Sequence, residues 1–122
     1  MSEPMDRKAF DADDLLERIG GDAELLDEIL GEYRSLREEL AAAVKHAAAQ
    51  GDAEALERAA HNLKGMLLAL SANPAAEAAQ VLEVAGRTGG MNDTLRDVTA
   101  LERELAAFDA ALDQHSARRR AA

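Results

Sequence analysis

The residues that could carry out chemistry are concentrated in one short segment, Ala59-Ala60-His61-Asn62-Leu63-Lys64-Gly65. If this segment is helical, Lys64 and Gly65 lie on the same face as the imidazole of His61, because residues three and four apart are neighbours on a helix surface. A neutral imidazole is a nucleophile near pH 7, and an ammonium beside it would stabilise an anion transferred to it. Phosphate is the obvious anion. The segment therefore predicts a histidine that accepts a phosphoryl group from a partner.

Gly65 is the informative residue of this segment. A glycine inside a helix costs about 0.5–1 kcal/mol relative to alanine, although the chain uses alanine at 28 other positions. A missing side chain beside His61 would let another molecule approach the ring, and Leu68, seven residues after His61, would continue the same face as a partly exposed leucine. Gly31 also falls inside a predicted helix without an evident function, so the argument needs the whole segment.

Other kinds of site are excluded by residue type and spacing. The chain has no cysteine, which rules out disulfides, thiolate metal sites and a cysteine nucleophile. None of the three histidines, His46, His61 and His115, follows an acidic residue by three positions, as a carboxylate-bridged metal pair on a helical bundle would require. A glycine-rich phosphate loop and a Gly-x-Ser-x-Gly elbow are both missing from the sequence. We expect His46 and His115 to be surface residues near helix ends.

The charge balance limits the partners. Fourteen basic and 24 acidic residues give a formal net charge of −10, and such a surface repels the phosphates of nucleic acid and anionic lipid. The first residues lack the apolar run of a signal peptide, and no segment approaches 18 consecutive apolar residues. We therefore expect a cytoplasmic monomer that binds neither nucleic acid nor membranes.

The elements that position His61 must be helices. The chain contains 28 alanines and 17 leucines but only nine Val, Ile and Thr residues together, which favours helices over strands. Turn signals divide the chain into a short helix over about 11–19 and four longer helices. The first three of the longer helices have Asp22, Asp52 and Asn73 as their expected N-caps. The last helix begins near Asn92. The second and third extend to about Gln50 and Leu70, and the fourth ends in the glycine-containing stretch 86–90.

We predict an all-α protein, an antiparallel four-helix bundle with a short additional N-terminal helix. Residues 1–9 are expected to be a flexible segment, 10–115 the bundle and 116–122 a frayed tail. The predicted buried positions follow steps of three and four: Leu26, Ile29, Tyr33, Leu36, Leu40, Ala43 and Ala47; Leu56, Ala60, Leu63, Leu67 and Leu70; Ala75, Ala78, Leu82 and Ala85; and Leu95, Val98, Leu101, Leu105, Phe108 and Leu112. His61 stands one residue off this stripe, so its ring tip should reach water.

From about Phe10 to Leu112 the chain resembles the histidine phosphotransfer (Hpt) domain family of multistep two-component phosphorelays. The family hallmark His-x-Leu-Lys-Gly matches His61 to Gly65, and the preceding Gly51-Asp52-Ala53-Glu54-Ala55-Leu56 resembles the start of the helix that carries it. The resemblance implies that an aspartyl phosphate of a response-regulator receiver domain phosphorylates His61 on Nε2. It also implies that Lys64 supports the charge of the phosphoryl group and that Gly65 admits the receiver.

Further expectations follow from the same resemblance. The family often places a polar side chain 22 residues after the histidine, which here is Glu83; its carboxylate would accept the Nδ1 hydrogen and fix the ring tautomer, or it would simply be a solvated helix residue. Arg58, Asn62 and Leu68 are expected to contact the partner. The chain itself would need no cofactor, since the Mg²⁺ belongs to the receiver. It would be a carrier without kinase or hydrolase activity of its own.

Two departures from the family pattern and three alternatives remain. The chain has Met66 where the family has a small residue, and Ser71 where it has a second glycine; the latter change is expected to remove a flexible helix end. The resemblance also implies a second partner besides the receiver domain, a hybrid histidine kinase.

The main alternative to a phosphoryl carrier is an Hpt-like interaction module that binds signalling partners without being phosphorylated. A purely structural bundle and an independent enzyme are the other two, and the enzyme has the least support.

Overall fold

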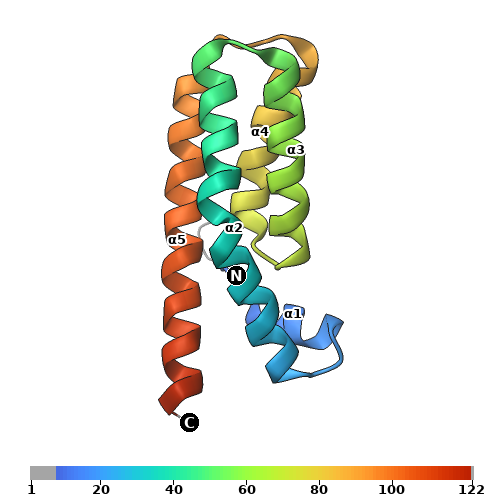
Figure 1. Cartoon of the computed structure of the whole chain (residues 1–122), viewed down its shortest axis with the longest axis vertical. Helices are drawn as coiled ribbons and strands as arrows, with labels where there is room; N and C mark the ends of the chain where they lie inside the picture. Colours follow the sequence, from blue (N-terminus) through green and yellow to red (C-terminus); the bar gives the residue numbers. More distant parts are fainter. Residues whose placement is uncertain (1–7, 122) are drawn as a thin grey trace, which may run out of the picture.

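The structure, a computed structural model, describes residues 8–121, and these residues form helices and connecting turns with no strand among them. The helices are α1 (Ala12–Arg18), α2 (Ala23–Gln50), α3 (Ala53–Ala69), α4 (Asn73–Thr88) and α5 (Thr94–Ala121). The four long helices run side by side, and α1 lies below the turn between α3 and α4 (Figure 1). The predicted all-α class is confirmed. Of the expected flexible segment 1–9, residues 1–7 lie outside the described part of the chain.

Aspartates begin the first three helices. The side chains of Asp22 and Asp52 accept hydrogen bonds from the amides of Leu25 and Ala55, at 3.0 and 3.1 Å, which satisfies donors that the first helical turn leaves unpaired. The predicted N-cap of α4 was wrong, because Asn73 is the first helical residue of α4 and Ala72 is its N-cap. The turn from α3 is so short that the cap position is fully buried, and a small apolar residue fits there better than an amide.

The predicted stripe of α3 is confirmed, whereas that of α2 is displaced along its second half. All five predicted positions of α3 are buried, but in α2 the buried residues are Leu26, Leu30, Tyr33, Ala41, Val44, Ala47 and Ala48. Leu36 and Leu40 are half-buried and Ala43 is exposed. The alanine-rich stretch from 41 to 49 offers small residues on every face, so periodicity alone did not identify the face that packs.

The last two helices also differ from expectation in detail. In α4, Ala79 is buried and Ala78 only partly, and the helix continues through Gly86 to Thr88. In α5, Leu95 is 76% exposed, because the core face of this helix begins at Thr94 and Val98. In the segment expected to be a frayed tail, α5 continues to Ala121 and the Arg119 guanidinium pairs with Asp27 of α2 at 2.7 Å; the fraying itself stays a prediction.

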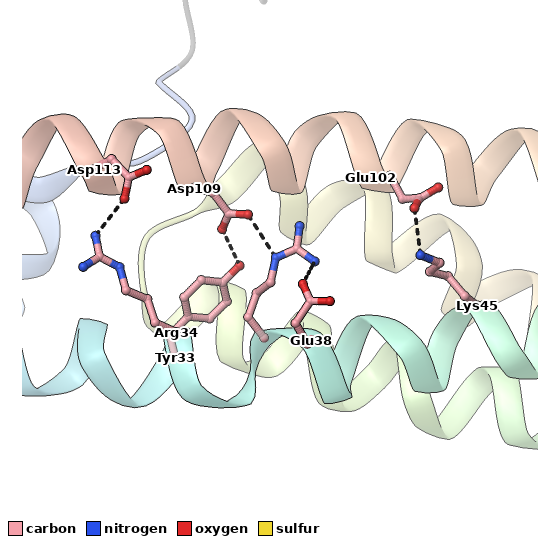
Figure 2. A network of polar contacts seen from close by, with 8 residues as sticks. Tyr33, Arg34, Glu38, Lys45, Glu102, Asp109 and Asp113 are labelled. Atoms are coloured by element: carbon pink, nitrogen blue, oxygen red, sulfur yellow. Dashed lines mark hydrogen bonds and ion pairs between the residues drawn. The ribbon is translucent and has the colours of Figure 1, made fainter.

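A row of polar contacts joins α2 to α5 (Figure 2). The Tyr33 hydroxyl donates to Asp109 Oδ1 at 3.2 Å, and Arg37 Nε donates to Asp109 Oδ2 at 2.9 Å. On either side lie ion pairs of Arg34 with Asp113, at 3.3 Å, and of Lys45 with Glu102, at 3.1 Å. Burial and, secondarily, the Asp109 carboxylate raise the pKa of Tyr33 well above its ordinary value. These contacts fix the register of the two longest helices.

Ser71 forms the tight turn that ends α3. Its φ of 57° lies in the left-handed region, which costs a non-glycine residue about 1 kcal/mol. The amides of Ser71 and Ala72 donate to the carbonyls of Leu68 and Leu67, at 3.2 and 2.9 Å, the pattern of a Schellman motif. The backbone therefore keeps the conformation that glycine favours, and the expectation that serine removes a flexible helix end stays a prediction.

Candidate functional site

The candidate site lies on the face of α3 that borders α4. The His61 side chain is 64% exposed, in agreement with the expectation that its ring tip reaches water. Its Nδ1 lies 2.9 Å from Oε2 of Glu83 in α4. The predicted contact between these two residues is therefore present, and Glu83 is a buried residue rather than a solvated one. Helix α4 thus supplies a carboxylate within hydrogen-bond distance of the imidazole.

Glu83 is shared between two partners. Its Oε2 faces His61, and its Oε1 lies 2.5 Å from Nζ of Lys64. Lys64 Nζ also donates to Oε1 of Gln80 at 2.7 Å. The Lys64 side chain is only 21% exposed, so this ammonium is held against α4 beside the imidazole rather than extended into solvent.

The electrostatics of Glu83 decide the tautomer of His61. The hydrogen bond from Lys64 lowers the pKa of Glu83, burial opposes this effect, and the contact with His61 lowers the pKa further, so that the value lies below the ordinary one. Glu83 is therefore ionised near neutral pH and can only accept hydrogen bonds. In neutral His61 the single ring proton must then lie on Nδ1, and Nε2 keeps its lone pair for attack on an electrophile.

The surface around His61 is open. A Cβ placed on Gly65 would meet no atom outside its own stretch of α3 within 4 Å, and the Leu68 side chain is 48% exposed. Two shallow hollows of about 400 Å³ flank the group of His61, Glu83 and Lys64. One is lined by Glu57, Arg58, His61, Asn62 and Glu83, and the other by Lys64, Leu68, Asn73, Ala76, Glu77 and Gln80. The site can thus receive a large surface from another molecule.

The remaining predicted site residues lie on the same face. Arg58 is exposed and pairs with Glu54 of its own helix at 2.9 Å, and Asn62 is exposed in the hollow next to the imidazole. Gln80 was missed by the sequence analysis, although it precedes Glu83 by three residues and hence shares its helix face. That spacing was the available signal.

The other two histidines lie elsewhere. His46 is exposed, as expected. His115 is only partly exposed, because its ring packs edge-on against Phe10 with centroids 5.7 Å apart, so its prediction as a plain surface residue was wrong. Across residues 8–121, no group of three or more His, Cys, Asp or Glu side chains could hold a metal ion. In the same range, every helix is too short or too polar to cross a membrane.

The comparison with protein families gives a match over most of the chain. The model of the Hpt domain family matches residues 24–111, from the first turn of α2 into the second half of α5. This range contains His61, Lys64, Gly65, Gln80 and Glu83, and it leaves out α1. No curated protein and no solved structure gives a significant match to the chain.

Proposed function

Because the chain belongs to the Hpt domain family, we propose that it carries a phosphoryl group on His61 and exchanges it with the aspartate of a response-regulator receiver domain. The single observation that carries this proposal is the hydrogen bond between His61 Nδ1 and the ionised Glu83. It leaves Nε2 unprotonated on a side chain that is 64% exposed and that lies one helical turn from the open position of Gly65. An imidazole held in this way is a nucleophile for an incoming aspartyl phosphate.

The proposed reaction is an in-line displacement at phosphorus. The Nε2 lone pair forms the N–P bond while the bond between phosphorus and the aspartyl oxygen breaks, and the receiver carboxylate leaves with that electron pair. The ring keeps its Nδ1 proton and becomes positively charged. Glu83, which already accepts that proton's hydrogen bond, stabilises the new charge. Reversal of the same steps returns the phosphoryl group to an aspartate.

Lys64 supports the proposal by its charge. Lys64 is one helical turn from His61, and its ammonium contacts the same carboxylate, so we propose that its charge supports the phosphoryl oxygens. The Mg²⁺ of the reaction would be supplied by the receiver. The chain would act as a carrier that depends on its partners for both delivery and removal of the phosphoryl group.

The exposure of His61 favours a carrier over the alternative of a non-phosphorylated interaction module. A module of that kind would need no accessible nucleophile, whereas the His61 side chain is 64% exposed. Receiver domains and a hybrid histidine kinase are the partners that we propose, with Arg58, Asn62 and Leu68 at the contact. We also propose that the protein works in the cytoplasm as a monomer.

The test is transfer of radiolabelled phosphate from a phosphorylated receiver domain. We expect acid-labile label on the wild-type chain and none on His61→Gln, with equal helicity of the two proteins by circular dichroism. His46→Gln is the matched control, since His46 is also exposed but lies on α2, and it should be labelled like the wild type. Equal labelling of His61→Gln would refute the assignment.

A further inference from the structure

Arg18 of helix α1 contacts the C-terminal end of α3. Nη2 of Arg18 donates to the carbonyl oxygens of Leu68 and Ala69, at 3.2 and 3.0 Å, and to Oγ of Ser71 at 2.5 Å. Helix α3, which the structure describes in full, has no basic residue in its last turn. Arg18 therefore brings from another helix the positive charge that the C-terminal end of a helix favours.

Asp14 and Ser71 complete this attachment. The Ser71 hydroxyl donates to Asp14 Oδ2 at 2.7 Å, and Asp14 pairs with Arg18 Nε at 3.3 Å. The amide of Asp11 donates to the Ser71 carbonyl at 3.1 Å. Ser71 is fully buried in a left-handed conformation. A glycine would adopt this conformation without strain but could not make the two side-chain contacts, which gives the serine a role. We call Asp14, Arg18 and Ser71 the α1 clamp.

The α1 clamp acts on a residue of the partner-facing surface. Leu68, whose carbonyl accepts from Arg18, presents its side chain to solvent and lines the same hollow as Lys64 and Gln80. This hollow is continuous with the phosphoryl site through Lys64, which contacts Glu83. Leu68 stands two helical turns after His61, or about 10 Å along the helix axis. A partner that reaches His61 can therefore contact Leu68 at the same time.

We propose that the α1 clamp holds the last turn of α3 in place so that Leu68 forms a second contact for the receiver domain, and that Asp14, Arg18 and Ser71 are thus positioning residues for docking. This inference rests on the proposed function. Receiver binding depends on the clamp, whereas the reactivity of His61 does not, since the contacts that orient its ring come from α4. Asp14 and Arg18 of the clamp precede the first residue of the family match, whereas Ser71 lies within it.

The experiment separates docking from chemistry. Transfer from a phosphorylated receiver domain is measured over a range of receiver concentrations, and phosphoramidate, a small donor that reacts with histidine directly, is used in parallel. For Arg18→Ala we expect the KM for the receiver to rise at least fivefold, with the maximal rate and the phosphoramidate rate within twofold of wild type. Leu68→Ala and Ser71→Ala should shift KM in the same direction.

The matched control is Arg34→Ala. Arg34 is likewise an exposed arginine with an aspartate and a serine as partners, but it lies on the α2–α5 side, so its KM should equal that of the wild type. If KM were unchanged in both Arg18→Ala and Ser71→Ala, the inference would be overturned and the proposed function would stand. The same holds if KM were unchanged in Leu68→Ala. An equal fall of the phosphoramidate rate in the folded clamp variants would also overturn it. Failure of both donors to label the wild type would instead refute the proposed function, and this inference with it.

Discussion

Gly86 of α4 lies directly against the backbone of Glu57 in α3. A Cβ built on Gly86 would be 2.5 Å from the Glu57 amide nitrogen and 2.6 Å from the Ala53 carbonyl oxygen, distances that no real side chain could keep. The two helices can approach this closely only because position 86 carries no side chain. Since His61 follows Glu57 by one turn and Glu83 precedes Gly86 by nearly one, the close approach sets the distance across which the carboxylate reaches the imidazole.

The first prediction compares two alanine substitutions at helical glycines. Gly86→Ala should lower the free energy of unfolding by about 1–3 kcal/mol, because the added methyl group meets backbone that must move. Gly65→Ala should raise it by about 0.5–1 kcal/mol, because the new Cβ enters open space and alanine is the better helix former. Urea unfolding followed by circular dichroism measures both. Equal effects of the two substitutions would contradict the packing difference between these positions.

The second prediction concerns access to the imidazole. Gly65→Leu should leave the fold intact, since the side chain points into space without described neighbours, but it should slow phosphoryl transfer from a receiver at least tenfold by covering the approach to His61. Gly65→Ala should slow transfer less. The transfer rates are measured at a fixed receiver concentration by quenching the labelling reaction at a series of times. If Gly65→Leu transferred at the wild-type rate, the gap beside the ring would have no role.

The helices and the exposure of His61 were predictable from the sequence, while the contacts between helices were less so. Asp22 and Asp52 are local signals, and the leucines of α3 leave one choice of buried face. By contrast, the face of α2 beyond Leu36 was misjudged, because alanine gives almost no hydrophobic contrast between faces. The close packing at Gly86 could not be predicted either, because a glycine at this position is also consistent with a helix end.

The third prediction uses the pH dependence of stability. Lys64 and His61 hold the pKa of Glu83 below its ordinary value, so the ionised carboxylate stabilises the folded state above the pKa of the unfolded chain, about 4.3. This contribution is lost as the pH falls through the folded-state pKa. The free energy of unfolding of the wild type should therefore fall more steeply below pH 4.5 than that of Glu83→Gln. Parallel urea titrations between pH 7 and pH 3 measure the difference, and identical slopes would contradict it.

The fourth prediction concerns Tyr33, the only tyrosine of the chain. Burial and Asp109 raise its pKa, so the folded state retains the phenol proton more strongly than the unfolded state does. The free energy of unfolding should thus fall as the pH rises above about 10. Ultraviolet absorbance of tyrosinate should appear together with the loss of helicity rather than before it. Ionisation near pH 10 in the folded protein would show that the hydroxyl is not sequestered.

At the candidate site, the sequence indicated which residues lie close together but not how they share their contacts. His61, Lys64 and Gly65 follow from spacing along one helix. The pairing of Lys64 with Glu83 and Gln80 depends on the relative placement of α3 and α4, which no local pattern encodes. Ser71 is the clearest case: from the sequence it is only a missing glycine, and its partners Asp14 and Arg18 come from a helix more than 50 residues away.

Helices α2 and α5 are 28 residues each, against 17 and 16 for α3 and α4, and their surplus length extends past the end of the shorter pair (Figure 1). The C-terminal end of α5 consequently lies beyond the end of α3, the helix that carries His61 (Figure 1). A fluorescent label or a fused protein attached there would leave the imidazole accessible to incoming partners, which makes this end the natural anchor for surface immobilisation.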